Sequence, residues 1–289
     1  MAVPTVEMIP VSDLAASYRG VVLDVFGVIH DGVSAFPGVR AALGQLQKRG
    51  IKTCLLSNSP RRADEVAKRL DAMGIGRDLY QGLITSGELT YQALNDFFEF
   101  PAGSSYFHIG PMELAGLTSG LPMNASRSLD TADFVLATGW PEDETLTGKL
   151  LPACLARRLP MICANPDLEV FIGDKKVICA GALARDYEML GGRVISYGKP
   201  FQAAYLKALG VLCLSPEQTL AIGDSIATDI VGGQRAGLDT ALVLTGVHKN
   251  CLTPAGGVDH FMLLELFRQH DVEPDFVLPS LGWPSRARR

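Results

Sequence analysis

The stretch "VVLDVFGVIHDG", residues 21–32, begins like a buried strand and stops at an acid. Apolar residues lead up to Asp24, and Phe26 follows two positions later. A short apolar run of this kind, bounded by turn residues, is typical of a strand inside a parallel sheet. Ligands of open parallel sheets bind beyond the carboxyl ends of the strands, so a carboxylate at that point is a candidate for chemistry.

Strands and helices alternate after this stretch. The run "IKTCLL" (51–56) is the next predicted strand, and Ser59 is expected to cap the helix that follows it. The run "GLIT" (82–85) is a third strand. Thr85 and Glu88 have capping-box spacing at the head of another helix. This alternation predicts βαβ units, and therefore parallel strands with right-handed crossovers.

The length and the order of the elements predict two domains. A chain of 289 residues is long for one hydrophobic core. The strand–helix alternation returns near the C-terminus, and the block between the two halves has strands and helices of its own. We therefore predict an α/β fold with a doubly wound parallel-sheet core of residues 1–87 and 194–289. Residues 88–193 would form an inserted second α/β domain.

Composition argues against several classes of protein. The chain is 47% hydrophobic and 20% charged, with a net charge of −5. Long apolar stretches and a signal-like N-terminus are both lacking, so we expect a cytoplasmic protein without a membrane partner. Basic residues form no large block, which disfavours nucleic acid. The six cysteines include no C-x-x-C pair, and the five histidines lack the spacing of a zinc site.

Chemically distinctive side chains follow four predicted strands. They are Asp24, Ser57 with Asn58, Lys199, and Asp224 with Asp229. Each of them has an ordinary explanation as a turn, cap or surface residue. Together, at the same edge of one sheet, they suit phosphoryl transfer. Two carboxylates are suitable ligands for Mg²⁺, a lysine adds positive charge beside a phosphate, and an aspartate can attack phosphorus.

Four motifs in the sequence resemble, in order, those of the haloacid dehalogenase (HAD) superfamily. They are "LDVFGV", "LLSNS", "YGKP" and "IGDSIATDI". The large insertion between the second and third motifs is similar to that of class IIA, the NagD-like phosphatases with a C2-type cap. The segments "ANPDLEV" and "AGALARDYEMLGG" resemble the cap signatures of that branch. The resemblance implies a Rossmann-like HAD core and an α/β cap domain.

The resemblance also implies roles for the core residues. Asp24 would be the nucleophile, with Ser57 and Lys199 binding the phosphoryl group. Asp224 would bind Mg²⁺, and Asp229 would orient the water shell of the metal. The expected substrate is a small phosphorylated metabolite, and relatives of this class suggest a homodimer.

Three further residues are expected to contact the substrate. Asn58 belongs to the same motif as Ser57, and the cap residues Asn165 and Asp167 would lie near the mouth of the site. An ordinary Asx-Pro turn is the alternative explanation for the segment "NPD", residues 165–167.

The main departure from the family pattern is Phe26. Phosphatases of the family usually carry a second aspartate at this position, which protonates the leaving oxygen and then activates water. The metal site is unaffected, because the family uses only the backbone carbonyl of this residue as a ligand. General acid–base catalysis, worth typically about 10²–10⁴-fold, is what the phenylalanine removes.

Three functions remain open after this substitution. The first is a Mg²⁺-dependent phosphatase that is slow or prefers good leaving groups, such as acyl or aryl phosphates. The second is another HAD reaction, dehalogenase- or phosphonatase-like; the latter would need a cap lysine such as Lys149, Lys175 or Lys176. The third is a non-catalytic binder of phosphate ligands. His30 is a candidate to replace the missing acid, since its ordinary pKa suits proton transfer.

Overall fold

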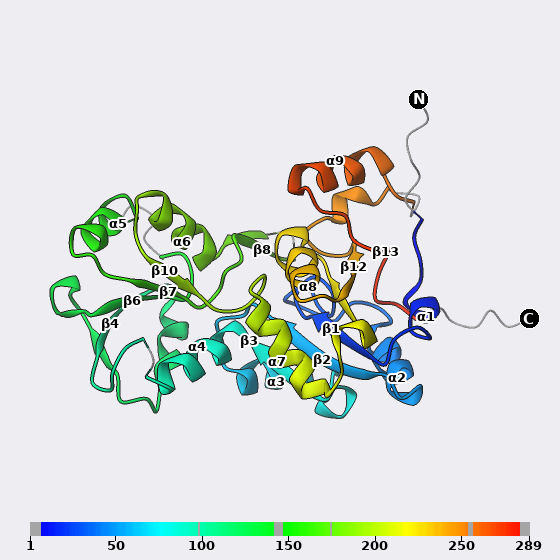
Figure 1. Ribbon diagram of the computed structural model, residues 1–289, viewed down its shortest axis with the longest axis horizontal. Coiled ribbons are helices and arrows are strands. Elements are labelled where there is room, and N and C mark those ends of the chain that lie inside the picture. The colour runs from blue at the N-terminus through cyan, green and yellow to red at the C-terminus, as the bar shows by residue number, and fades with distance from the viewer. Residues whose placement is uncertain (1–6, 98, 142–146, 174, 254–256, 284–289) are drawn as a thin grey trace, which may run out of the picture.

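The computed structural model describes residues 7–97, 99–141, 147–173, 175–253 and 257–283. It consists of two α/β parts that lie side by side (Figure 1). The larger part contains the two ends of the described chain, and the smaller part is built from its middle. The chain therefore leaves one sheet, forms a second, and returns to complete the first, as the sequence predicts.

The larger part is built on a six-stranded sheet in the order β13-β12-β11-β1-β2-β3, and all its strands are parallel. Its strands are β1 (Gly20–Asp24), β2 (Lys52–Ser57), β3 (Gly82–Thr85), β11 (Thr219–Gly223), β12 (Asp239–Val243) and β13 (Phe276–Leu278). Its helices are α1 (Val11–Leu14), α2 (Val39–Lys48), α3 (Ala63–Ala72), α7 (Gln202–Leu212), α8 (Val231–Arg235) and α9 (His260–His270). The strand order reverses beside β1, and this is the point where such sheets bind their ligands.

Helices cover both faces of this sheet, as the alternation of side chains along β1 shows. Val21 and Leu23 belong to the core that includes Leu43 of α2. Val22 points the other way, into the core that includes Ala204 of α7. All of β1 is buried, which a central strand of a parallel sheet requires. Burial of one such aliphatic side chain stabilises the fold by about 1.5–3 kcal/mol.

The smaller part has a five-stranded parallel sheet in the order β10-β7-β6-β4-β5 and a separate antiparallel hairpin, β8–β9. Its strands are β4 (Ser105–Ile109), β5 (Asn124–Ser126), β6 (Phe134–Ala137), β7 (Met161–Cys163), β8 (Glu169–Ile172), β9 (Lys175–Ile178) and β10 (Val194–Ser196). Helix α4 (Ser86–Asn95) leads into it, and it contains α5 (Thr147–Ala156) and α6 (Ala180–Met189). Short 3₁₀ or π turns are η1 (Arg77–Leu79), η2 (Met112–Thr118), η3 (Leu129–Thr131), η5 (Pro216–Gln218), η6 (Ile226–Ile230) and η7 (Lys249–Cys251).

One strand lies in a different sheet from the one expected. The sequence pattern places residues 194–196 in the second half of the core, but β10 pairs with β7 of the smaller sheet. A three-residue strand carries too little pattern to identify its neighbours, and only pairing decides its sheet. The domain bounds at residues 88 and 193 stay a prediction, with β10 lying just beyond the second of them.

The helix that follows β2 also differs from expectation. Ser59 does not cap it, because α3 begins at Ala63 with Arg62 at the N-cap position and no capping side chain. A loop therefore separates Ser57 from the first turn of this helix. The capping box expected at the next helix is present only in half. The side chain of Thr85 accepts a hydrogen bond from the Glu88 N–H (2.9 Å) at the start of α4, whereas the Glu88 carboxylate binds Arg62.

The described ranges contain no helix with the length and apolar character that a bilayer crossing needs. A cytoplasmic location stays a prediction. All six cysteines are free thiols, and five of them are buried.

Candidate active site

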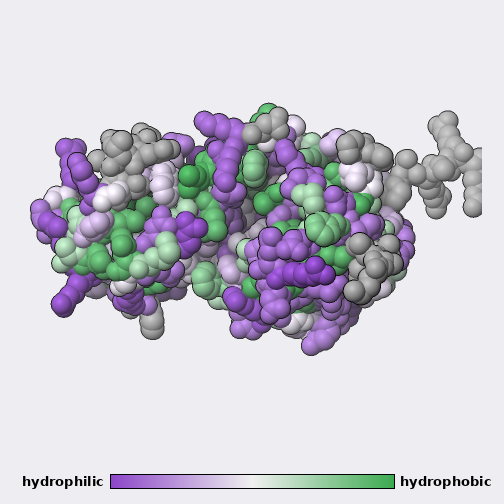
Figure 2. Space-filling model, turned by 90° about the horizontal axis from the view of Figure 1, so that it is seen from above, coloured by the Kyte–Doolittle hydropathy of each residue, from purple (hydrophilic) through white to green (hydrophobic). Residues whose placement is uncertain are grey.

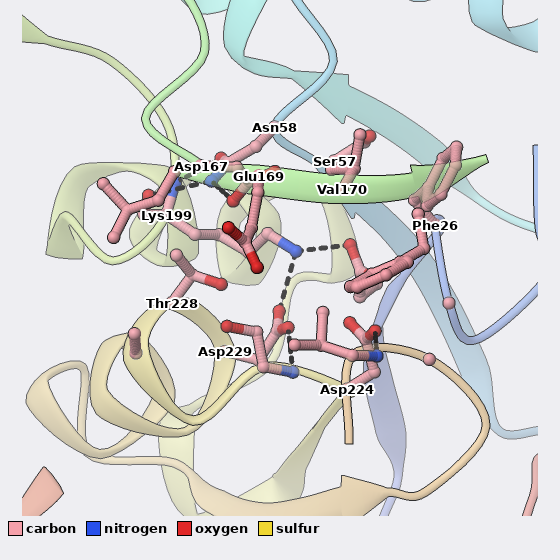
Figure 3. Close-up of a pocket in the computed structure, with 18 of the residues that line it drawn as sticks. Phe26, Ser57, Asn58, Asp167, Glu169, Val170, Lys199, Asp224, Thr228 and Asp229 are labelled. Atoms are coloured by element: carbon pink, nitrogen blue, oxygen red, sulfur yellow. Dashed lines mark hydrogen bonds and ion pairs between the residues drawn. The ribbon is translucent and has the colours of Figure 1, made fainter. Parts of the chain in front are cut away.

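The candidate site lies at the carboxyl edge of the larger sheet, at the point where its strand order reverses (Figure 3). Asp24 is the last residue of β1, Ser57 is the last residue of β2, and Asp224 follows β11 directly. Each of the three is no more than 5% exposed. Three neighbouring parallel strands therefore deliver three polar side chains to one buried place, which the sequence pattern predicts.

Lys199 reaches the same place by a different route. It was expected to follow a strand of the larger sheet, but it follows β10 of the smaller one and lies on the segment that returns to α7. Its side chain is nevertheless buried among the acids, with 3% exposure. The prediction that all four groups meet is confirmed, whereas the prediction that four strands of one sheet carry them is wrong.

Lys199 forms ion pairs with two of the acids. Its Nζ contacts an oxygen of Asp24 and lies 2.7 Å from Oδ1 of Asp229 (Figure 3). Burial lowers the pKa of Lys199, but the carboxylates of Asp229 and Asp24 together raise this pKa by more than burial lowers it, so the net shift is upward. Burial raises the pKa of Asp24, and the positive charge of Lys199 opposes this. Lys199 thus remains an ammonium that holds Asp24 in place.

Three acids form a cluster that can hold a cation. Oxygens of Asp24, Asp224 and Asp229 all lie within 4.8 Å of one another. Burial, and then the charge of Asp229, raise the pKa of Asp224 to about 7. The single ammonium of Lys199 cannot balance three carboxylates, so this donor set fits a hard divalent cation with oxygen ligands such as Mg²⁺.

Close backbone packing fixes the Asp224 carboxylate. The Val247 N–H donates a hydrogen bond to its Oδ2 (2.7 Å). Gly27 has a φ of +85°, and a Cβ at Gly27 or Gly246 would collide with the carboxylate. Both positions therefore need glycine. The segment at Thr245–Val247 was missed in the sequence, although it follows strand β12 and the rule used for the other strand ends would have pointed to it.

Asn58 joins three parts of the chain. Its Nδ2 donates to the backbone C=O of Lys199 (3.0 Å), and its Oδ1 accepts from the N–H of the same residue (2.7 Å). The same Nδ2 also donates to Oδ1 of Asp167 (2.8 Å). Asn58 thus ties the end of β2 to the returning segment and to a loop of the smaller part.

The cap residues Asn165 and Asp167 both line the pocket. The Asp167 N–H donates to Oδ1 of Asn165 (3.1 Å), so the Asx turn proposed as the alternative is also present. The turn orders the loop, and the Asp167 side chain, which comes from the smaller part, accepts a hydrogen bond from Asn58 of the larger part. The structural and the functional explanation of "NPD" are therefore compatible.

The cluster of Asp24, Asp224 and Asp229 lines a cavity of about 790 Å³ between the two parts. Figure 2 shows the two parts of the molecule from another side, with a recess between them. Much of the cavity wall is apolar, and its apolar side chains include those of Phe26, Phe36, Leu168, Val170, Phe171 and Val247. The sequence did not indicate the contribution of the β8–β9 hairpin, because a short amphipathic hairpin carries no signature of a ligand.

The ring of Phe26 lies on the cavity wall, at the position of the usual family acid. The Phe26 and His30 rings pack in a T-shaped arrangement, with their centroids 5.1 Å apart. A Cβ at Gly32 would press on the Phe26 ring and on Ile172 of β8. The Gly173 N–H donates to the C=O of Asp31 (3.0 Å), so the hairpin rests on the loop that carries Phe26.

His30 is not positioned to replace the missing acid. Its side chain is buried, Nδ1 accepts a hydrogen bond from the Gly32 N–H (2.9 Å), and it is not among the residues that line the cavity. Burial is the main cause that lowers the pKa of His30 to about 4. The ring is therefore neutral at pH 7 and has no acidic proton to supply.

This buried imidazole predicts an acid-sensitive fold. A histidine whose pKa falls from about 6.5 to about 4 on folding favours the folded state above pH 6.5, and this contribution is lost as the pH falls toward 4. The difference corresponds to about 3 kcal/mol. Urea titrations of wild type and His30→Gln between pH 7.5 and 4.5 measure it. We expect the wild type to lose more stability than the variant, and parallel curves would contradict the assignment.

Comparisons with known proteins agree with this geometry. Models of haloacid dehalogenase-like hydrolases match residues 21–118 and 196–283. The chain is 28% identical to Homo sapiens chronophin over 285 residues, 93% of each chain. It is 28% identical over 236 residues to ribonucleotide monophosphatase NagD of Escherichia coli K12, covering 79% of this chain and 88% of NagD. A haloacid dehalogenase-like hydrolase from Brucella suis 1330 has 31% identity and a TM-score of 0.80, covering 94% of this chain and 98% of that one.

Proposed function

Because this chain belongs to the haloacid dehalogenase-like hydrolases, among the NagD- and chronophin-like class IIA phosphatases, we propose that it hydrolyses a small phosphorylated metabolite with Mg²⁺ through a phosphorylated Asp24. The observation that carries the proposal is the buried cluster of Asp24, Asp224 and Asp229 around one ammonium, that of Lys199. It combines a nucleophile, a cation site and a charge for the phosphoryl group.

The residues of the cluster would divide the work as follows. An oxygen of Asp24 attacks phosphorus, and the bond from phosphorus to the leaving oxygen breaks. Lys199 and Ser57 bind the phosphoryl oxygens, and Lys199 also orients the attacking carboxylate. Water then attacks the phosphorylated Asp24, which releases phosphate and restores the carboxylate.

Asp24, Asp224 and the backbone carbonyl of Phe26 would hold Mg²⁺, and Asp229 would orient the water around it. The ion, when bound, neutralises phosphate charge so that an anionic nucleophile can approach. Phe26 contributes to this site only through its backbone, so its ring affects proton transfer and the shape of the cavity but not the metal.

The alternative functions have less support. A phosphonatase-like reaction would need a cap lysine in the site, but Lys149, Lys175 and Lys176 are not among the residues that line the cavity. A dehalogenase has no use for the acidic cluster. A non-catalytic binder would not need Asp24 at the end of β1, paired with a buried lysine.

A panel of phosphorylated metabolites, assayed with and without Mg²⁺, tests the proposed function directly. We expect release of phosphate that requires Mg²⁺ and is abolished by EDTA. Binding of the same compounds with no release of phosphate would favour the non-catalytic alternative.

Asp224 and Asp229 should contribute differently to metal binding. Asp224→Ala is expected to abolish Mg²⁺ binding, because it removes one of only two direct side-chain ligands. Asp229→Ala should weaken binding by a smaller factor, about 10–100-fold, as is usual for groups that orient a ligand or a bound water. Isothermal titration calorimetry with Mg²⁺ measures both. Unchanged affinity in Asp224→Ala would refute the assignment.

A further inference from the structure

A proton donor for the leaving group has to come from outside the first motif, because residue 26 is a phenylalanine. Among the described residues, the carboxyl groups that line the cavity are those of Asp24, Asp31, Asp167, Glu169, Asp224 and Asp229. Three of them, Asp24, Asp224 and Asp229, form the acidic cluster and cannot also serve as the acid. Asp31, Asp167 and Glu169 remain.

Two of these three already have other partners. Oδ1 of Asp31 accepts hydrogen bonds from the N–H groups of Val33 (2.9 Å) and Ser34 (2.8 Å), and these bonds lower the pKa of its carboxyl. Glu169 forms an ion pair with Lys176 across the β8–β9 hairpin, and its side chain is 36% exposed. Asp31 therefore stays ionised near neutral pH, and the Glu169 carboxylate is taken up by its ion pair with Lys176.

Asp167 has the opposite surroundings. Its Oδ1 accepts the hydrogen bond from Asn58, and Asn58 is itself held by both backbone groups of Lys199. The carboxyl is therefore held in the pocket by Asn58, the residue that follows Ser57 in the chain. Figure 3 shows Asp167 and Glu169 across the pocket from Asp224 and Asp229.

This place suits the leaving group. In an in-line displacement the leaving oxygen lies on the far side of phosphorus from the attacking atom. Asp24 lies at the end of β1 in the larger part, and Asp167 lies on a loop of the smaller part that lines the same cavity. A phosphate ester held between the two parts would present its leaving oxygen to that loop.

The surroundings of Asp167 raise the pKa of its carboxyl. Burial is the largest influence and raises the pKa of its carboxyl, the charge of Lys199 and the Asn58 hydrogen bond lower it, and the charge of Asp229 raises it again, with a net shift upward. The titratable groups that face it are Lys199, Tyr205, Asp224, Asp229, Cys163 and Cys179.

We propose that Asp167, from the smaller part, is the catalytic acid and base that replaces the missing acid of the first motif. This inference rests on the proposed phosphatase function. As Asp24 attacks and the phosphorus–oxygen bond breaks, the electron pair goes to the leaving oxygen, and the Asp167 O–H gives it a proton. The Asp167 carboxylate then takes a proton from the water that attacks phosphorus, the bond to Asp24 breaks, and phosphate leaves.

The test is Asp167→Asn, which keeps an oxygen for the Asn58 hydrogen bond but cannot exchange a proton. The two substrates are p-nitrophenyl phosphate and an alkyl phosphate such as glycerol 3-phosphate. Their hydrolysis is measured by rapid-mixing kinetics. With the alkyl ester we expect a loss of about 10²–10⁴-fold. With the aryl ester, the first step should stay within about tenfold, and a burst of one p-nitrophenol per enzyme should precede slow turnover, because the base for water is missing.

A matched control is Glu169→Gln, at the start of β8 two residues after Asp167, which should leave the ratio of alkyl to aryl rates unchanged. Infrared difference spectra of wild type minus Asp167→Asn should show the C=O band of a protonated carboxyl at pH 7. This measurement does not depend on activity.

Three results would overturn the proposal. The first is an equal loss of rate with both esters in Asp167→Asn, which would make Asp167 only structural. The second is wild-type activity retained in Asp167→Asn. The third is a wild-type rate that already falls steeply as the pKa of the leaving group rises, which would mean that no acid operates. In each of these cases, aryl turnover through a phosphorylated Asp24 would leave the phosphatase function standing.

Discussion

Asp24→Asn is expected to abolish the hydrolysis of every phosphate ester, with a loss of more than about 10⁴-fold in kcat, the scale seen when a catalytic nucleophile is removed. The amide has the shape of the carboxylate but cannot attack phosphorus. The fold should survive, because Lys199 keeps its ion pair with Asp229. The measurement is kcat on p-nitrophenyl phosphate, together with mass spectrometry of acid-quenched enzyme, in which the wild type gains one phosphoryl group and the variant does not.

Asp31→Asn provides the control for this experiment. Asp31 lines the same cavity and also follows β1, but its Oδ1 only accepts hydrogen bonds from the turn at Val33 and Ser34. An asparagine oxygen can accept the same bonds, so phosphorylation of the enzyme should persist. A phosphorylated enzyme in Asp24→Asn would show that another residue is the nucleophile.

Lys199→Met should lower the free energy of unfolding by about 3–5 kcal/mol, the usual cost of removing one partner from a buried ion pair. The side chain is 3% exposed and pairs with both Asp24 and Asp229. Methionine of similar length would leave three carboxylates facing one another in a buried place with no positive charge. Activity should be lost as well, because the phosphoryl group loses the positive charge of the Lys199 ammonium.

Urea unfolding with and without Mg²⁺ separates the electrostatic cause from simple packing. If repulsion among the acids is the cause, Mg²⁺ should recover more stability in Lys199→Met than in the wild type, since a ligand that binds only the folded state stabilises it. Lys207→Met is the control, because that lysine pairs at the surface of α7 with Gln92. Equal, small effects in both variants would contradict the buried-charge account.

Much of the core could be predicted from sequence because its signals are local. Apolar runs that end at Asp24 and Ser57 identify strands whose carboxyl ends carry polar groups, and the capping pattern at Thr85 identifies the start of α4. In a parallel sheet, strands that end in the same sense bring their last residues to one edge. That geometry was enough to expect the acids and Ser57 in one site.

The sequence alone therefore determined the fold class, the family, the acidic cluster and the absence of the usual acid at Phe26. The tertiary structure decided which sheet holds β10, how Lys199 reaches the acids, and that Asn58 binds Asp167 across more than a hundred residues of chain. These features depend on pairing between distant segments, and a side chain on a short strand or loop shows no periodicity that could indicate its partner. The burial of His30 was likewise invisible, because the pKa of a side chain depends on what packs against it and not on its neighbours in the chain.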